Sequence, residues 1–278
     1  MKQDQISDDT IAYSRCRYGE SRLVFRGPRR NLDQPYLAFV GGASTYGKFV
    51  DKPFPVLVEE AMRRPCVNLG CVNAGVDAIL GDKSVMDICR NAEMTVVQAT
   101  GAHLLSNRFY GVHPRRNDRF LWASTVMRAI YHEVDFSEFT FTRHMLGALL
   151  RRCPDRFETV VAELQTAWVA RMRTMLTGMG ENVFLVWFAD QPPVDDHWSD
   201  HPGQLQADPL FVTRTMIEEL RPLVRELVTI TAPSATMTPQ VSIPAKQPCT
   251  QITVLGEKAH QQAATALTRR LRDHLTMA

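Results

Sequence analysis

Short apolar runs alternate with amphipathic stretches along the first hundred residues of the chain. The runs are apolar almost throughout, as in strands that are buried on both faces, and they cover residues 36–40, 66–69 and 94–99. The stretches between them have apolar positions at helical spacing and cover residues 54–62 and 82–92. Because strands that alternate with helices usually pair in parallel, the pattern predicts a parallel sheet covered by helices.

The pattern changes after Gly101. Three stretches with helical spacing follow one another without a strand between them, at residues 115–131, 142–152 and 156–179. The region from about residue 113 to residue 180 is therefore predicted to be a helical insertion.

Strand signals return near the C-terminus, at residues 182–189 and 227–231, with a helix expected near residues 209–226 and a terminal helix from about residue 258 to 275. The fold class that results is α/β, a three-layer sandwich with a five-stranded, mainly parallel sheet and a helical insertion. This domain is expected to cover residues 36–278. Residues 1–35 carry many arginines among few apolar positions, and we expect a basic N-terminal extension outside the core.

The composition narrows the classes of function. The 278 residues include 32 Lys and Arg against 30 Asp and Glu, a balance that argues against a dedicated nucleic-acid binder. The longest apolar run, residues 183–189, is far shorter than the roughly 20 residues of a membrane span, and the polar first ten residues do not resemble a signal peptide. The six cysteines include no C-x-x-C pair. We expect a cytoplasmic protein with reduced thiols that works as a monomer or as a homo-oligomer.

The loop after the first predicted strand is compatible with two chemistries. Residues 42–48 approach the phosphate-loop pattern G-x-x-x-x-G-K, in which backbone N–H groups and the lysine hold phosphates. The next position, which should ligate magnesium, holds Phe49. The other interpretation is a nucleophile loop, with Ser44 or Thr45 at the end of a strand where open α/β sheets bind their ligands.

Two further segments carry candidate chemistry. Glu257 and His260 lie three residues apart before the terminal helix, as a general base and the carboxylate that orients it would. A second segment combines acidic residues with histidines, at Asp195, Asp196, His197, Asp200 and His201. It lacks the fixed spacing of a metal motif, so we interpret it as a polar loop and expect neither a metal nor a cofactor.

Four segments in this order resemble the SGNH (GDSL-type) esterase and acyltransferase superfamily. They are FVGGASTYG at residues 39–47, VNLGCVNAG at 67–75, VVQATGAH at 96–103 and EKAH at 257–260. The resemblance implies a five-stranded, flavodoxin-like α/β fold. It implies a nucleophile, a base and an orienting acid at Ser44, His260 and Glu257, and oxyanion-binding groups at Gly70, Asn73, His103 and Asn107.

The first of these segments departs from the superfamily pattern. Gly42 or Ala43 stands where the superfamily has aspartate, and matching Thr45 to the common S-x-T-x-G form places Ala43 at the nucleophile. Ser44 fits after a shift of one residue, and His103 replaces an asparagine. A catalytically degenerate SGNH fold that binds a glycan or helps a partner enzyme is therefore an alternative to the active enzyme.

The chain also resembles a group of uncharacterised bacterial proteins that share its segments 106–110 and 113–120. These segments contain three arginines, Arg108, Arg115 and Arg116. Together they suggest a cationic surface that binds a carboxylate, sulfate or phosphate of the substrate. Solvated surfaces and ion pairs explain the same residues equally well. The leading hypothesis is a serine esterase or O-acyltransferase that acts on an ester of a small molecule or of a polar or anionic carbohydrate. A nucleotide-dependent transferase that uses the loop from Gly42 to Lys48 is a further alternative.

Overall fold

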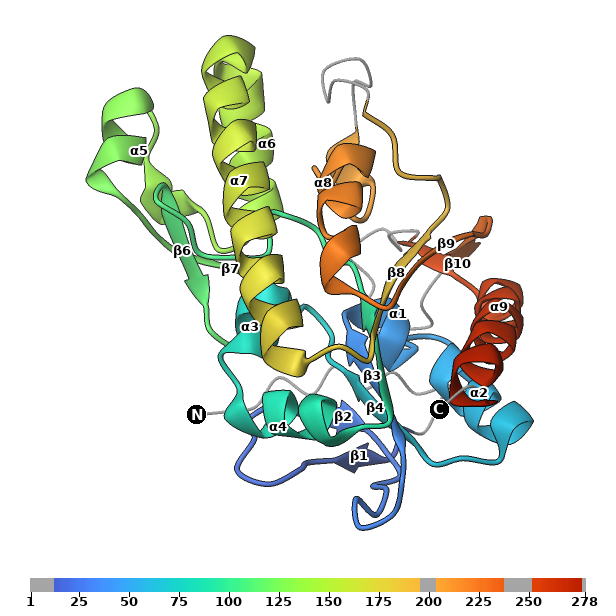
Figure 1. The fold of residues 1–278 in the computed structure, drawn as a ribbon. Coiled ribbons are helices and arrows are strands. Elements are labelled where there is room, and N and C mark those ends of the chain that lie inside the picture. Colours follow the sequence, from blue (N-terminus) through green and yellow to red (C-terminus); the bar gives the residue numbers. More distant parts are fainter. Residues whose placement is uncertain (1–12, 196–203, 238–251, 277–278) are drawn as a thin grey trace, which may run out of the picture.

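The computed structural model describes residues 13–195, 204–237 and 252–276, and a five-stranded parallel sheet forms its centre (Figure 1). The strand order is β4-β3-β5-β8-β9, and every pair is parallel. The strands are β3 (Leu37–Gly41), β4 (Cys66–Gly70), β5 (Met94–Gln98), β8 (Val183–Ala189) and β9 (Glu226–Thr231). The predicted α/β class with a parallel sheet is confirmed.

Alternate residues of each strand enter two separate cores, one on each face of the sheet. Leu37 and Phe39 of β3 pack beneath α2 (Phe54–Met62) and α9 (Glu257–Thr276). Ala38 and Val40 belong to the larger core on the other face. The helices that contribute to that core include α3 (Val76–Leu80), α4 (Lys83–Asn91) and α7 (Pro154–Met179). Burial on both faces explains why β3, β4, β5 and β8 are mostly apolar, whereas the edge strand β9 alternates buried and exposed residues.

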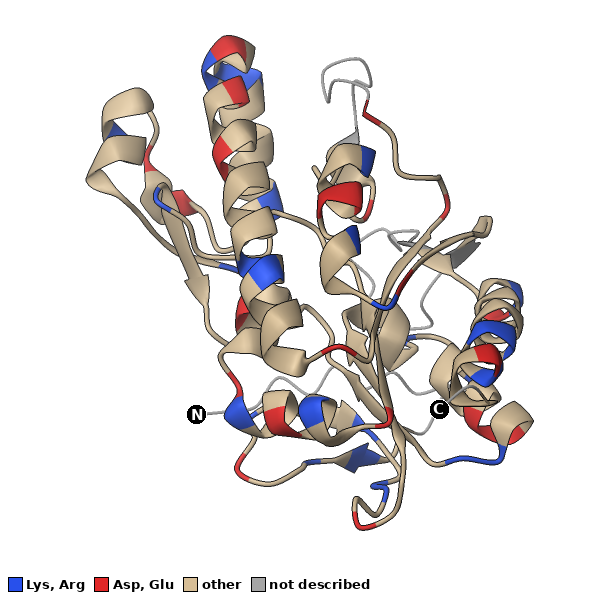
Figure 2. Cartoon of the chain, viewed as in Figure 1, with Lys and Arg blue, Asp and Glu red and all other residues tan. Residues whose placement is uncertain are grey.

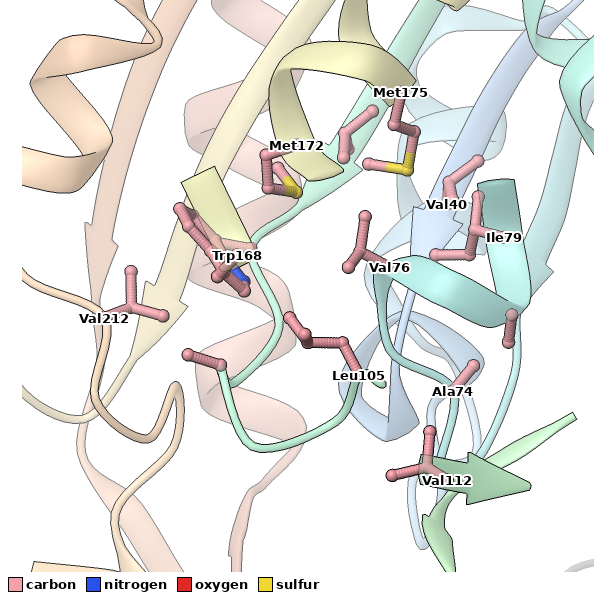
Figure 3. Close-up of a cluster of buried hydrophobic side chains, with 14 of the residues drawn as sticks. Val40, Ala74, Val76, Ile79, Leu105, Val112, Trp168, Met172, Met175 and Val212 are labelled. Carbon is pink, nitrogen blue, oxygen red and sulfur yellow. The ribbon is translucent and has the colours of Figure 1, made fainter. Parts of the chain in front are cut away.

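The larger core depends on the long helix α7. Figure 3 shows Trp168, Met172 and Met175 of this helix gathered beside Val40 of β3 and Val76 of α3. Trp168 also donates a hydrogen bond from its indole nitrogen to the carbonyl of Thr100, at 2.8 Å. The helix therefore holds the loop that follows β5 as well as the core.

The insertion contains a β-hairpin that the sequence did not predict. Residues 116–123 form β7 (Arg116–Ala123), which pairs antiparallel with β6 (Tyr110–His113), so the predicted helix over 115–131 is wrong there. The register shifts twice within the hairpin, and the buried positions of β7 fall three residues apart, which imitates a helical period. The expected helices are α5 (Thr125–Ile130) and α6 (Thr142–Arg152), followed by α7, with a 3₁₀ turn at Phe136–Glu138.

The N-terminal segment belongs to the folded domain. A small two-stranded sheet pairs β1 (Arg15–Cys16) with β2 (Phe25–Arg26), and the side chains of Tyr18, Leu23 and Phe25 are buried in the larger core. The expectation that this segment lies outside the core does not hold for residues 13–35. Burying these large apolar side chains contributes about 1.5–3 kcal/mol each to folding.

The C-terminal part follows the expectation in outline. The helix expected near 209–226 is reduced to α8 (Arg214–Glu219), between 3₁₀ turns at Gln204–Gln206 and Arg221–Leu223. After β9, a hairpin pairs β10 (Ser234–Met237) with β11 (Ile252–Leu255), directly before α9. In the described parts of the chain, no helix is both long enough and apolar enough to cross a bilayer.

Candidate functional site

The loop after β3 is built around a one-turn helix, α1 (Ala43–Tyr46). The side chain of Gln98, at the end of β5, accepts hydrogen bonds from the Thr45 hydroxyl at 2.6 Å and from the Thr45 N–H at 3.1 Å. Only glycine fits at position 41, because a Cβ there would lie 2.3 Å from the Thr45 hydroxyl oxygen. These contacts fix α1 at the carboxyl end of the sheet, where parallel α/β folds bind ligands.

The loops after β3, β4 and β5 meet at this end of the sheet. Gly41 and Gly70 are register partners, and the Cys71 N–H donates to the Gly41 carbonyl at 3.0 Å. A Cβ at Gly42 would lie 3.6 Å from the Thr100 methyl group and 3.7 Å from the Ala74 carbonyl. The region therefore brings together the first three segments on which the SGNH resemblance depends.

Ser44 lies in the first turn of α1, half-buried beside the exposed Ala43. Its hydroxyl forms no hydrogen bond with the part of the chain that the structure describes. Asn73, in the next loop, has a left-handed backbone with φ of 63° and a half-buried side chain that is likewise without a described partner. Two neutral hydrogen-bonding groups therefore remain free at the ends of neighbouring strands.

His260 is buried in the core beneath α2, and no described hydrogen bond joins it to Ser44 or to Asn73. Its ring stacks on Phe54 with 5.8 Å between centroids and meets the edge of Phe188 at 5.4 Å. The N–H of Phe54, the first residue of α2, donates to His260 Nδ1 at 3.0 Å. Burial, followed by the positive charge of Arg26, lowers the pKa of His260 to about 4. His260 therefore satisfies one of the free N–H groups at the start of α2.

This arrangement differs from that of a catalytic histidine. A triad base donates from one ring nitrogen to its orienting carboxylate, whereas His260 Nδ1 is an acceptor here. Glu257 is exposed at the start of α9, and no described hydrogen bond joins it to His260. The structure does not bring Ser44, Glu257 and His260 together through hydrogen bonds among the residues it describes.

Two of the expected oxyanion groups are already engaged. The N–H of Gly70 donates to Asn68 Oδ1 at 2.9 Å, and a Cβ at Gly70 would lie 2.2 Å from the backbone nitrogen of Tyr46. Asn107 Oδ1 accepts from the N–H groups of Phe109 and Tyr110 at 2.8 and 3.2 Å. Gly70 thus gives α1 room to pack, and Asn107 shapes its own turn.

His103 is the remaining residue among the expected oxyanion-binding groups. It lies in the loop after β5 and contacts a residue of the insertion. The ring is 3 % exposed, and its Nε2 lies 3.4 Å from Nη2 of Arg143, at the start of α6. Burial and then the Arg143 charge lower the pKa of His103 well below its ordinary value. Arg143 also contacts Asp208, at 2.7 Å. Asp208 belongs to none of the sequence motifs, and Gln98 lies in the segment VVQATGAH without a role assigned to it, because the roles of both residues depend on partners distant in the sequence.

The family model for DUF6473, a domain of unknown function, matches residues 1–275. The chain belongs to the DUF6473 family. A search of curated proteins finds no match to it.

Solved structures resemble this DUF6473 chain at low sequence identity. A family 2 carbohydrate esterase with a carbohydrate-binding domain from Corynascus thermopiles (Myceliophthora fergusii) is 11% identical, with TM-score 0.41 over 90% of this chain and 69% of that one. A family 2 carbohydrate esterase from Clostridium thermocellum, in complex with cellohexaose, is 8% identical, with TM-score 0.41 over 92% and 69%. An acetyl xylan esterase from Butyrivibrio proteoclasticus is 12% identical, with TM-score 0.41 over 91% and 66%.

Two of the three arginines expected to form a cationic binding surface are in ion pairs with carboxylates in the DUF6473 chain. Arg108 Nε lies 3.0 Å from Glu163, and Arg116 Nε lies 4.0 Å from Asp118. Arg115 is exposed, with no ion pair to a described residue. Figure 2 shows both signs of charge interspersed along α7 and α9, as ion pairing on a solvated surface requires.

The phosphate-loop alternative does not fit the geometry of the DUF6473 chain. Lys48 follows the end of α1, where Gly47 is left-handed with φ of 77°, and its Nζ lies 4.6 Å from the centre of the Phe49 ring. A phosphate-loop lysine instead begins a helix, whose N-terminal N–H groups face the phosphates.

The polar loop near residue 200 is only partly described. Asp195 accepts a hydrogen bond from the Thr215 N–H at 2.7 Å, whereas Asp196, His197, Asp200 and His201 lie outside the described residues. Among residues 13–195, 204–237 and 252–276, no group of three or more His, Cys, Asp or Glu side chains could hold a metal ion.

Proposed function

We propose that the chain binds a polar carbohydrate, or an ester of one, where the loops after β3, β4 and β5 meet, without hydrolysing it through a serine and a histidine. The observation that carries this proposal is the placement of His260. Its Nδ1 accepts the Phe54 N–H, and its ring lies between Phe54 and Phe188. In this state the Nδ1 lone pair is already used by a backbone N–H, and no described hydrogen bond joins the ring to Glu257 or to Ser44.

The free groups at the ends of the strands support a ligand rich in hydroxyl groups. The Ser44 hydroxyl donates and accepts, and the Asn73 amide offers a carbonyl and an NH₂ group. Both are half-buried and lie on loops that are anchored by buried hydrogen bonds. Neutral, partly shielded groups of this kind match the hydroxyl and acyl oxygens of an acylated sugar.

The test is a binding titration with acetylated and with deacetylated xylo-oligosaccharides, monitored by NMR. A separate assay measures any acetate that is released. We expect saturable binding with the acetyl groups intact. Ser44→Ala together with Asn73→Ala should weaken binding about tenfold, the equivalent of about 1.4 kcal/mol from lost hydrogen bonds. Asn91→Ala, at an exposed position on α4, is the matched control. Release of acetate that requires Ser44 would overturn the proposal.

One observation favours a second candidate, a serine esterase or O-acyltransferase. Ser44 lies in the first turn of a helix that begins directly after a central strand, and its hydroxyl has no described partner. In this candidate Ser44 attacks the acyl carbon, His260 takes the serine proton and Glu257 orients His260. The ester C–O bond breaks, His260 returns the proton to the departing alcohol, and water or an acceptor hydroxyl then takes the acyl group from Ser44. Asn73 and His103 stabilise the oxyanion, and Arg108, Arg115 and Arg116 attract a negatively charged substrate.

A fluorophosphonate probe separates the two candidates. The esterase requires an adduct on Ser44 that is absent from both Ser44→Ala and His260→Gln, because the probe reports an activated serine. The binding proposal requires no adduct in the folded wild-type protein. Peptide mass mapping identifies the labelled residue, and circular dichroism of each variant shows that it is folded.

A further inference from the structure

Strand β7 separates from its partner strand at one point, by an irregular bulge. Val112 and His113 follow one another in β6. Their partners in β7, Phe120 and Arg116, are four residues apart, so three residues of β7 lie opposite a single step of β6. A bulge of this kind takes backbone groups out of the ladder and re-aims side chains. The first of the three residues, Asn117, is fully buried.

The buried amide of Asn117 joins the insertion to the loop after β4. Its Oδ1 accepts the N–H of Gly75 at 2.8 Å and the N–H of Ala78 at 3.1 Å. Its Nδ2 donates to the carbonyl of His113 at 3.0 Å, and its backbone N–H donates to the carbonyl of Asn73 at 2.9 Å. Three of these four hydrogen bonds therefore reach residues 73–78.

Asn117 also supplies a helix cap that this loop lacks. Gly75 is the N-cap residue of α3, and it has no side chain that could accept an N–H of the first turn. A Cβ at Gly75 would lie 2.0 Å from the carbonyl oxygen of Leu104, so a capping residue does not fit there. Asn117 Oδ1 instead accepts the N–H of Ala78, the third residue of α3, which is a group that an N-cap side chain usually takes.

The same contacts hold the turn that contains Asn73. The Ala74 N–H donates to the Cys71 carbonyl at 3.1 Å, which closes a β-turn with Asn73 at its third position. The left-handed backbone of Asn73 is the one that a type II turn requires there. The two peptide groups that follow Asn73 both bond to Asn117, one through the Asn73 carbonyl and one through the Gly75 N–H. These bonds fix the direction in which the Asn73 side chain leaves the backbone.

We propose that Asn117 is a positioning residue for the candidate site, and that it acts by holding Asn73 in place for the ligand. The inference rests on the proposed function in taking Asn73 as a group that binds the ligand. It gives the hairpin of the insertion a role that does not require the arginines of the same segment. Loss of the Asn117 amide should let the turn move while the central sheet stays intact.

The first measurement needs no ligand. Hydrogen exchange of the Gly75 and Ala78 N–H groups reports their bonds to Asn117, and the NMR resonances of the Asn73 amide groups report its position. Asn117→Leu keeps the approximate shape of the side chain without its polar groups. We expect it to raise both exchange rates about tenfold and to shift the Asn73 resonances. Ser124→Ala, which removes the cap of α5 in the same insertion, is the matched control and should do neither.

The second measurement is a double-mutant cycle on the affinity for acetylated xylo-oligosaccharides. Asn117→Leu should weaken binding about threefold, as Asn73→Ala does, because one hydrogen-bonding group is lost from the site. In the Asn73→Ala background it should have almost no further effect, since no side chain is left to position. Asn117→Asp keeps the acceptor oxygen but loses the donor to His113, and it should recover part of the exchange protection and of the affinity.

Two results would overturn the inference. One is that exchange and the Asn73 resonances in Asn117→Leu match those in Ser124→Ala. The other is an equal loss of affinity from Asn117→Leu in both backgrounds, as general destabilisation would give. If Asn117→Leu does not fold, complete loss of protection in Asn117→Asp contradicts the inference instead. Failure of the oligosaccharides to bind the wild type would refute the proposed function, whereas the exchange measurement would still show whether Asn117 holds Asn73.

Discussion

Two histidines are buried among the described residues, and they differ in how fully their ring nitrogens are hydrogen-bonded. His260 and His103 are 1 % and 3 % exposed, and burial lowers the pKa of both. His260 Nδ1 accepts a backbone N–H in an apolar core, whereas His103 Nδ1 has no described partner. The comparison teaches that burial and a lowered pKa do not by themselves identify a functional histidine, because only one of these rings has unused capacity.

The largest expected effect is the dependence of stability on pH. His260 has an ordinary pKa of 6.5 and a pKa of about 4 in the folded protein, so the unfolded chain binds more protons between these values. Stability is fully present above pH 6.5 and is lost as the pH falls toward 4. We expect the titration of His260 to lower the free energy of unfolding by about 2–3 kcal/mol between pH 7.5 and pH 4.5.

Urea unfolding at the two pH values measures this change. His260→Gln keeps a hydrogen-bond acceptor but cannot titrate, so its stability should depend less on pH. Equal pH dependence in the two proteins would contradict the assignment to His260.

Leucine substitution at His260 should cost about 2 kcal/mol at pH 7.5. The apolar side chain suits the surrounding core, but the Phe54 N–H is left buried without an acceptor. Urea unfolding measures the loss, and His260→Gln should recover part of it. A loss below about 0.5 kcal/mol would show that water or another group satisfies this N–H.

The same substitution at His103 should change stability by less than about 1 kcal/mol in either direction. Leucine removes the buried N–H that has no acceptor, and the half-buried Arg143 retains its contacts with residues 205–208. The measurement is again urea unfolding, beside His260→Leu. A destabilisation as large as that of His260→Leu would break the comparison, since both histidines would then be structural.

The smallest effect is expected at Glu257. This side chain is exposed and has no described partner, so Glu257→Gln should alter the free energy of unfolding by less than about 0.5 kcal/mol. Oligosaccharide binding should also be unchanged. A fall in fluorophosphonate labelling of Ser44 on this substitution would instead favour the esterase, in which Glu257 orients the base.

The sheet was predictable because four of its strands, β3, β4, β5 and β8, are buried on both faces and therefore mostly apolar. Helix α7 was also predictable, because its buried apolar positions repeat at helical spacing along its whole length. The hairpin at β6 and β7 was missed because its register shifts replace the alternating pattern of a strand. Local periodicity carries no information about such shifts.

The candidate site was predictable only in part. The loop after β3 combines glycines and hydroxyl residues in a way that the sequence displays directly. The partner of His260 lies 206 residues away, and Asp208 lies 65 residues from Arg143. Sequence spacing cannot report contacts over such separations, so a motif such as EKAH gives the residue types without the direction of their hydrogen bonds.

The contact between His260 and Phe54 has a consequence for the order of synthesis. The start of α2 is made early, but the acceptor of its first N–H group lies 206 residues later, in α9. Until α9 has left the ribosome, α2 alone covers this apolar face of the central sheet. A nascent chain stalled before α9 would therefore be expected to engage chaperones, and nonsense mutations late in the gene should yield insoluble protein.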